Sequence, residues 1–155
     1  MIYLKNTGDY VVKLQIKGTL SASGAGSYAY SEPIPFASYL KAVWAQEATP
    51  GTNGTESVDL EYSASAAASG LGTLVSSGTL FSFASTASSA TYGDAKLNTN
   101  PPVFAKGGIL GLSVTTVHTT TAGADLVVIA VLARERGVIA PAVQTGTYSA
   151  DLDVA

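Results

Sequence analysis

The chain has 155 residues, no cysteine, 12% charged residues and a formal net charge of −3. Without cysteine it can form no disulfide, no thiolate metal site and no cysteine nucleophile. Its eight lysines and arginines are dispersed and outnumbered by eleven carboxylates, which disfavours a protein that binds nucleic acid through phosphates. A chain of this length fits one domain, which buries about two thirds of the surface that the unfolded chain exposes.

The first residues, MIYLKNTGDYVV, lack the basic segment and the apolar run of a secretory signal, because Asn6, Gly8 and Asp9 interrupt the apolar residues. The longest apolar run in the chain is shorter than a membrane span. We therefore expect a soluble product that is made in the cytosol and does not contact a membrane.

Short alternating or apolar segments separated by clusters of Gly, Ser, Thr and Asn predict about eight strands and no helix. Pro33 and Pro35 cannot donate to a sheet, so the segment around them should be an edge or a corner. The segment 85–102 has no periodicity and is predicted as a long loop that could carry contacts. The predicted strands are 2–5, 10–17, 28–36, 39–47, 57–63, 73–84, 109–118 and 125–134, of which 73–84 is either one interrupted strand or two short ones.

The strand 125–134 is the most continuously apolar segment, and it forms a pair with the strand before it. Leu126, Val128 and Ala130 alternate with Val127 and Ile129, so both faces need cover. This pattern predicts a central strand. Lys106-Gly107-Gly108 predicts a tight turn before the pair, and 119–124 predicts a polar crossing between its two strands.

The sequence Thr49-Pro50-Gly51-Thr52-Asn53-Gly54 contains two strong turn dipeptides between alternating segments, which predicts a hairpin. Trp44 is the only tryptophan. It shares a predicted strand face with Leu40 and Ala42, and we predict a core anchor in preference to a ligand-stacking role.

Three carboxylates, Glu56, Asp59 and Glu61, lie close together along one predicted strand. Such spacing could form a divalent-cation site or a glycosidase pair. We favour a solvated strand face, because nothing in the sequence shields these groups enough to raise a pKa. His118 is the only histidine, and no nucleophile elbow accompanies it, so we predict a structural or solvent-exposed role.

These strands predict an all-β fold, an antiparallel jelly-roll sandwich of about eight strands, although periodicity alone does not exclude an immunoglobulin-like sandwich. We expect one jelly-roll domain at 1–137 and an extended C-terminal arm at 138–155. The arm is aperiodic yet richer in apolar residues than a solvating tail needs. Candidate partner contacts in the two terminal segments are Ile2, Tyr3, Val138, Ile139, Val143, Tyr148, Leu152 and Val154.

The order of strands and turns from 36 to 134 resembles virion proteins of tailed phages. The similarity lies in the strand around Trp44, the turn TPGTNG, the strand VDLEY, and the segments FAKGGILGLSV and ADLVVIAVL. These features resemble jelly-roll cement or decoration proteins of the capsid, and related head-fibre and tail-fibre domains.

The resemblance implies a non-enzymatic protein, without a cofactor, that binds the outside of an assembled icosahedral head. It further implies a homotrimer that bridges neighbouring major capsid proteins, so that the protein is made in the host cytoplasm and ends in the virion. The sequence agrees, since it shows no catalytic constellation and a metal site is not expected.

A fibre tip or a carbohydrate-binding module is the alternative function, because the eight tyrosines could stack on sugars. Against it, Tyr10 and Tyr62 alternate with the inward-facing residues, which leaves few aromatics free. An esterase or glycosidase would need a nucleophile elbow or a shielded carboxylate pair, and the sequence indicates neither.

Overall fold

The computed structural model describes residues 9–24, 26–66, 71–75, 78–92, 97–99 and 101–134. Within these residues the chain forms ten strands, all paired antiparallel, and no helix. The strands are β1 (Asp9–Thr19), β2 (Tyr28–Tyr30), β3 (Ser38–Thr49), β4 (Thr55–Ser63), β5 (Gly72–Thr73), β6 (Phe81–Ala84), β7 (Thr91–Tyr92), β8 (Val103–Phe104), β9 (Ile109–Thr116) and β10 (Ala124–Arg134).

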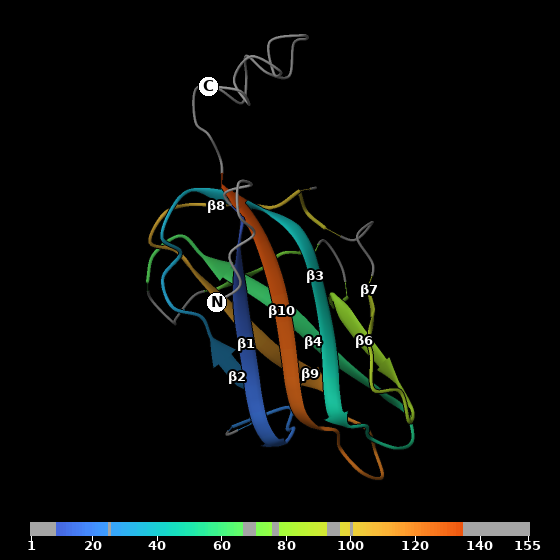
Figure 1. Cartoon of the computed structure of the whole chain (residues 1–155). Coiled ribbons are helices and arrows are strands. Elements are labelled where there is room, and N and C mark those ends of the chain that lie inside the picture. Colours follow the sequence, from blue (N-terminus) through green and yellow to red (C-terminus); the bar gives the residue numbers. More distant parts are fainter. Residues whose placement is uncertain are drawn as a thin grey trace, which may run out of the picture.

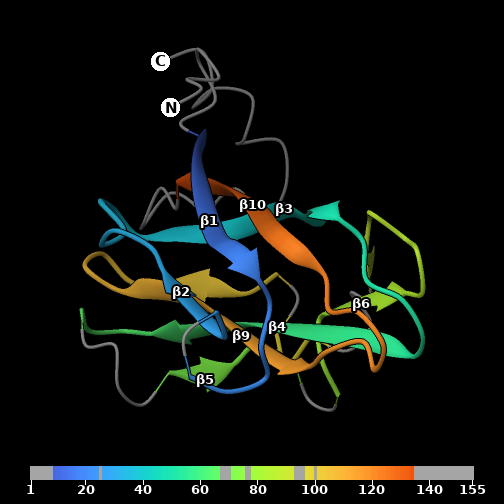
Figure 2. The same cartoon turned by 90° about the horizontal axis from the view of Figure 1, so that it is seen from below.

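The strands form two sheets that pack face to face as a sandwich (Figures 1 and 2). The four-stranded sheet has the order β1-β10-β3-β8, and the six-stranded sheet has the order β2-β9-β4-β6-β7, with β5 also paired to β4. When the short β5 and β7 are set aside, the remaining strands follow the order 1-8-3-6 in one sheet and 2-7-4-5 in the other. This is the order of a jelly roll, so the predicted fold class is confirmed.

The core lies between the two sheets and is built from the inward half of each alternating strand. Each large aliphatic or aromatic side chain buried there contributes about 1.5–3 kcal/mol relative to exposure. Members from the four-stranded sheet include Leu14, Ile16, Leu126, Val128 and Leu132, and members from the six-stranded sheet include Val58, Leu60, Phe81, Phe83, Leu112 and Val114.

The strand β10 lies between β1 and β3 and pairs with both along almost its whole length, so the prediction of a central strand is confirmed. Its residues Leu126, Val128 and Ala130 are fully buried. Val127 and Ile129, on the other side of the same strand, are only half-buried. The sandwich therefore covers one face of β10 and leaves the other face partly open at Val127 and Ile129.

The predicted hairpin at residues 49–54 is wrong, because β3 and β4 belong to different sheets. The turn itself exists, since Asn53 and Gly54 both take positive φ, of 66° and 84°. It carries the chain from one sheet to the other, and the Thr52 amide donates to the Thr121 carbonyl at 2.8 Å. A turn dipeptide shows that the chain reverses but does not choose which strand it pairs with.

Several other segments differ in extent from their predicted ranges. The segment after Tyr30 leaves the sheet before Pro33 and Pro35, as those prolines require. The predicted strand 73–84 is interrupted, with β5 and β6 at its two ends. The predicted loop 85–102 contains β7 and a bridge between Ser89 and Gln46. The predicted strand 2–5 lies outside the described residues.

Candidate interaction surface

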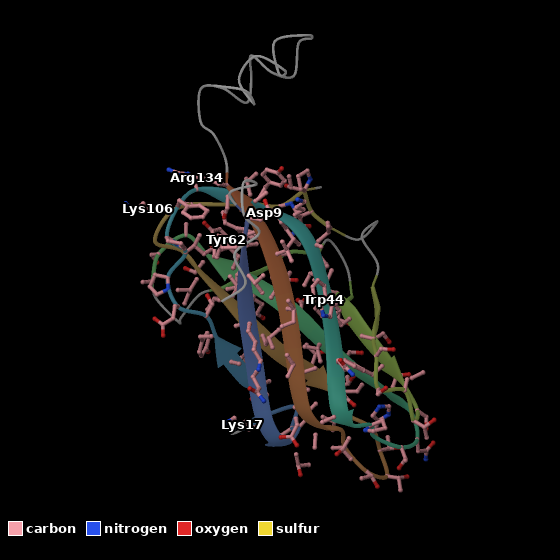
Figure 3. The ribbon with its side chains drawn as sticks, viewed as in Figure 1. Asp9, Lys17, Trp44, Tyr62, Lys106 and Arg134 are labelled. Atoms are coloured by element: carbon pink, nitrogen blue, oxygen red, sulfur yellow. The ribbon has the colours of Figure 1, made fainter. Side chains whose placement is uncertain are left out.

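The outer side of the four-stranded sheet carries apolar side chains that remain exposed or half-buried in the described part of the chain. Trp44 is 50% exposed and lies opposite Ile129, while Ala42 lies opposite Val131. Figure 3 shows Trp44 on β3, on the side of the sheet that faces the viewer. We call this surface the outer apolar face, and it consists of Tyr39, Ala42, Trp44, Val103, Val127 and Ile129.

The position of Trp44 contradicts the predicted core anchor, and a β-bulge in β3 is the reason. Val131 pairs with Ala42 but Leu132 pairs with Leu40, so Lys41 is an extra residue on β3. The bulge leaves both Lys41 and Ala42 on the outer side and reverses the alternation beyond them. Val43 then points inward and Trp44 points outward.

The same bulge directs Lys41 towards Asp9 on the far side of β10. The Lys41 ammonium lies 2.6 Å from the Asp9 carboxylate, and this hydrogen bond raises the pKa of Lys41. Lysines at positions 13 and 17 and Gln15 are exposed on β1, where Lys13 lies opposite Ile129. The outer apolar face therefore has a polar, partly cationic border along β1.

Two glutamates face each other inside one end of the sandwich. Glu47 on β3 is 1% exposed and Glu56 on β4 is 0% exposed. Burial raises the pKa of Glu47 to about 9, the Glu56 carboxyl adds to this increase, and the Gly51 backbone amide opposes it. The Gly123 amide donates to Glu56 Oε2 at 3.2 Å. At neutral pH the pair holds a proton, because two adjacent buried carboxylates would repel each other.

The prediction of a solvated face for the β4 carboxylates is therefore wrong for Glu56 and for Asp59. Glu56 shares the inward side of β4 with Val58, since the two residues are two positions apart. Asp59 points to the other side, but it accepts hydrogen bonds from the Thr73 hydroxyl and the Leu60 amide. Burial raises the pKa of Asp59 despite these bonds. Glu61 is half-buried, and burial and the nearby Asp59 raise its pKa.

His118 is 3% exposed and packs beneath the 50–54 turn. A Cβ at Gly51 would lie 2.7 Å from the ring carbon Cγ of His118, so only glycine fits above the ring. Neither ring nitrogen has a hydrogen-bond partner within the described part of the chain. Its position is structural, and the predicted alternative of solvent exposure is wrong.

The described ranges contain no group of three or more His, Cys, Asp or Glu residues arranged to hold a metal ion. None of their segments is a helix that is long and apolar enough to cross a membrane. The predicted partner contacts Ile2 and Tyr3, and those at 138–154, all lie outside the described residues. Sequence alternation does not predict the outer apolar face, because the exposure of Trp44 depends on the bulge at Lys41.

Comparison with known proteins gives one similar solved structure. No family model and no curated protein matches the chain. A chain of the cyanophage Pam1 capsid asymmetric unit is similar, with 15% sequence identity and a TM-score of 0.48, over 87% of this chain and 91% of that chain. A similarity of this size establishes neither a family nor a function.

Proposed function

We propose that this protein is a non-enzymatic virion protein that binds the outside of an icosahedral phage capsid and cements neighbouring major capsid proteins. The outer apolar face carries the proposal. A jelly roll that binds no other protein has no reason to leave Trp44 and Val103, 50% and 58% exposed, on the same side of one sheet. The strand and turn pattern at 36–134 points to the same class of protein.

In the proposed assembly, three copies associate through their outer apolar faces. The central part of this surface is aromatic and aliphatic, and its border along β1 is polar, which is the composition of protein interfaces. Tyr39 and Val103 pair across β3 and β8 and extend the surface towards the end of the sheet. A closed trimer would remove it from water on every copy.

The terminal segments would make the contacts with the capsid. We propose that 1–137 is the jelly-roll domain and that 138–155 is an arm that reaches adjacent capsid proteins. Each trimer would then bind through three arms at once, so its release would require the loss of several contacts together.

The oligomeric state and capsid binding of a Trp44→Lys variant test this proposal. Light scattering of the wild-type protein should give three times the 15.7 kDa mass of one copy. The protein should also sediment with purified capsids from which it is absent. A lysine at position 44 places a charge in the centre of the interface, so the variant should be monomeric and should bind capsids weakly.

The matched control is Tyr28→Lys, because Tyr28 is equally exposed, at 53%, but lies in the other sheet. This variant should remain a trimer and bind capsids as the wild type does. A monomeric wild-type protein, or a trimer that survives Trp44→Lys, would overturn the assigned interface. A wild-type protein that stays in the supernatant when capsids sediment would overturn the function.

A further inference from the structure

Two exposed tyrosines lie side by side on β2, the edge strand of the six-stranded sheet. Tyr28 is 53% exposed and Tyr30 is 46% exposed, and their ring planes are parallel to within 4° with centroids 6.4 Å apart. Both side chains leave the same side of β2, since they are two residues apart. Figure 2 shows β2 in the layer opposite β1, β10 and β3, so this pair is separate from the outer apolar face.

Small residues on the neighbouring strand β9 lie opposite the two tyrosines and leave room for their rings. Tyr28 lies opposite Ser113 and Tyr30 lies opposite Gly111. A Cβ at Gly111 would lie 3.4 Å from Cδ1 of the Tyr30 ring and 2.7 Å from the Leu71 side chain. The missing side chain at Gly111 therefore lets Tyr30 and Leu71 close over β9, while about half of each tyrosine remains open to solvent.

Two carboxyl groups on β4, the strand on the other side of β9, lie in the same cross-strand rows as the two tyrosines. Gly111 pairs with Glu61, and Ser113 pairs with Asp59, so each tyrosine shares a row with one carboxylate. Asp59 already accepts bonds from Thr73 and Leu60. Glu61 is half-buried, and among the described residues no hydrogen bond to its carboxyl is seen, so its oxygens can accept from a ligand.

We propose that Tyr28, Tyr30 and Glu61 form a binding site for a neutral oligosaccharide. The C–H faces of pyranose rings stack on aromatic rings, and the solvent-exposed parts of the stacked rings of Tyr28 and Tyr30 offer such surfaces. Sugar hydroxyls donate hydrogen bonds to carboxylates, which Glu61 supplies. An anionic ligand fits poorly, because the charged groups on this part of the sheet are carboxylates. The site goes beyond the proposed capsid function, and both surfaces can be occupied together.

The experiment measures binding of the full chain to cellohexaose, chitohexaose and maltohexaose by isothermal titration calorimetry. At least one should bind, and Tyr28→Ala and Tyr30→Ala should each weaken its affinity about tenfold, since each removes one stacking surface. Glu61→Gln should also weaken binding. The control is Lys106→Ala, which removes an exposed side chain from the turn before β9, outside both proposed surfaces, and should leave the affinity unchanged.

All of these substitutions are at partly or well exposed positions, and circular dichroism will show that each variant is folded. Failure of all three sugars to bind at millimolar concentration would overturn the proposal. Sugar binding that is unaffected by both tyrosine substitutions would overturn it equally. Binding of a proline-rich peptide in place of the sugars would assign the tyrosine pair to peptide recognition. None of these outcomes alters the test of the outer apolar face.

Discussion

At the scale of single residues, the buried pair Glu47 and Glu56 has the most unusual electrostatics. Both carboxyls lie between the sheets, and the Gly123 amide is the donor that reaches Glu56 Oε2. Desolvation disfavours a charge on Glu47, and the neighbouring Glu56 carboxyl adds to this effect, so the pKa of Glu47 is raised. At neutral pH the folded protein therefore keeps a proton that the unfolded chain has already released, since the ordinary pKa of a glutamate is 4.5.

This proton makes the stability of the protein depend on pH. The pKa of Glu47 is about 9 in the folded state against an ordinary value of 4.5, so the folded state binds the extra proton between these values. The free energy of unfolding should then fall as pH rises from 5 to 9, and Glu47 alone contributes at most about 1.4 kcal/mol per pH unit to this fall. Asp59 and Glu61, whose pKa values are also raised, act in the same direction.

Urea denaturation at pH 5, 7 and 9 measures this dependence, with Glu47→Gln as the control. Glutamine keeps the shape of the side chain but does not titrate. The free energy of unfolding of the variant should therefore change much less between pH 5 and pH 9 than that of the wild type. A wild-type stability that is constant over this range, or an unchanged decline in the variant, would contradict the shared proton.

A side chain at Gly123 would force the buried Glu47 carboxyl to move, because that carboxyl occupies the space of a Cβ at this position. A Cβ at Gly123 would lie 2.7 Å from Oε1 of Glu47. Gly123→Ala should therefore lower the free energy of unfolding by about 1–3 kcal/mol, as overpacking does. Gly72→Ala is the matched control, since a Cβ at Gly72 meets nothing within 4 Å. Thermal melts that place both variants within 1 °C of each other would rule out the close packing at Gly123 (about 0.3 kcal/mol or less).

At the scale of elements, the sequence predicts where strands lie better than which side of a strand faces the core. The alternation of apolar and polar residues predicts the ranges of β1, β9 and β10 to within two residues at each end, because each strand is long and periodic. It failed on β3, since the bulge at Lys41 adds one residue and moves Trp44 to the outside. The bulge forms through pairing with β10, which is distant in the sequence, so no local pattern reveals it.

The candidate surfaces were less predictable than the fold for the same reason. The burial of Glu56 could have been predicted by extending the alternation of Val58 and Leu60 by one step. The Tyr28 and Tyr30 pair was visible as two tyrosines at strand spacing. Its exposure depends on which side of β2 faces away from the core, and that follows only from the packing of the two sheets.

The segment 138–155 gives a prediction at this scale. Its deletion should weaken sedimentation with capsids, because the proposed arm supplies the capsid contact, while light scattering should still show a trimer. Trp44→Lys is the complementary control, since it should disrupt the trimer and leave the arm intact. Unchanged capsid occupancy after the deletion would remove the arm from the proposed mechanism.

At the scale of the whole molecule, the two sheets divide the surface into two separate sites. The outer apolar face belongs to the four-stranded sheet and is proposed to join three copies. The pair Tyr28 and Tyr30 belongs to the six-stranded sheet, which such a trimer would leave open to solvent. The jelly roll between them is a support that holds both surfaces in fixed positions.

The copy number of this protein in purified virions tests the central claim most directly. Quantitative mass spectrometry of intact particles gives its ratio to the major capsid protein. A decoration protein that cements the capsid should be present in a number comparable to that of the major capsid protein. A few copies per particle, as expected of a tail or fibre component, or absence from the particle, would contradict the proposed function.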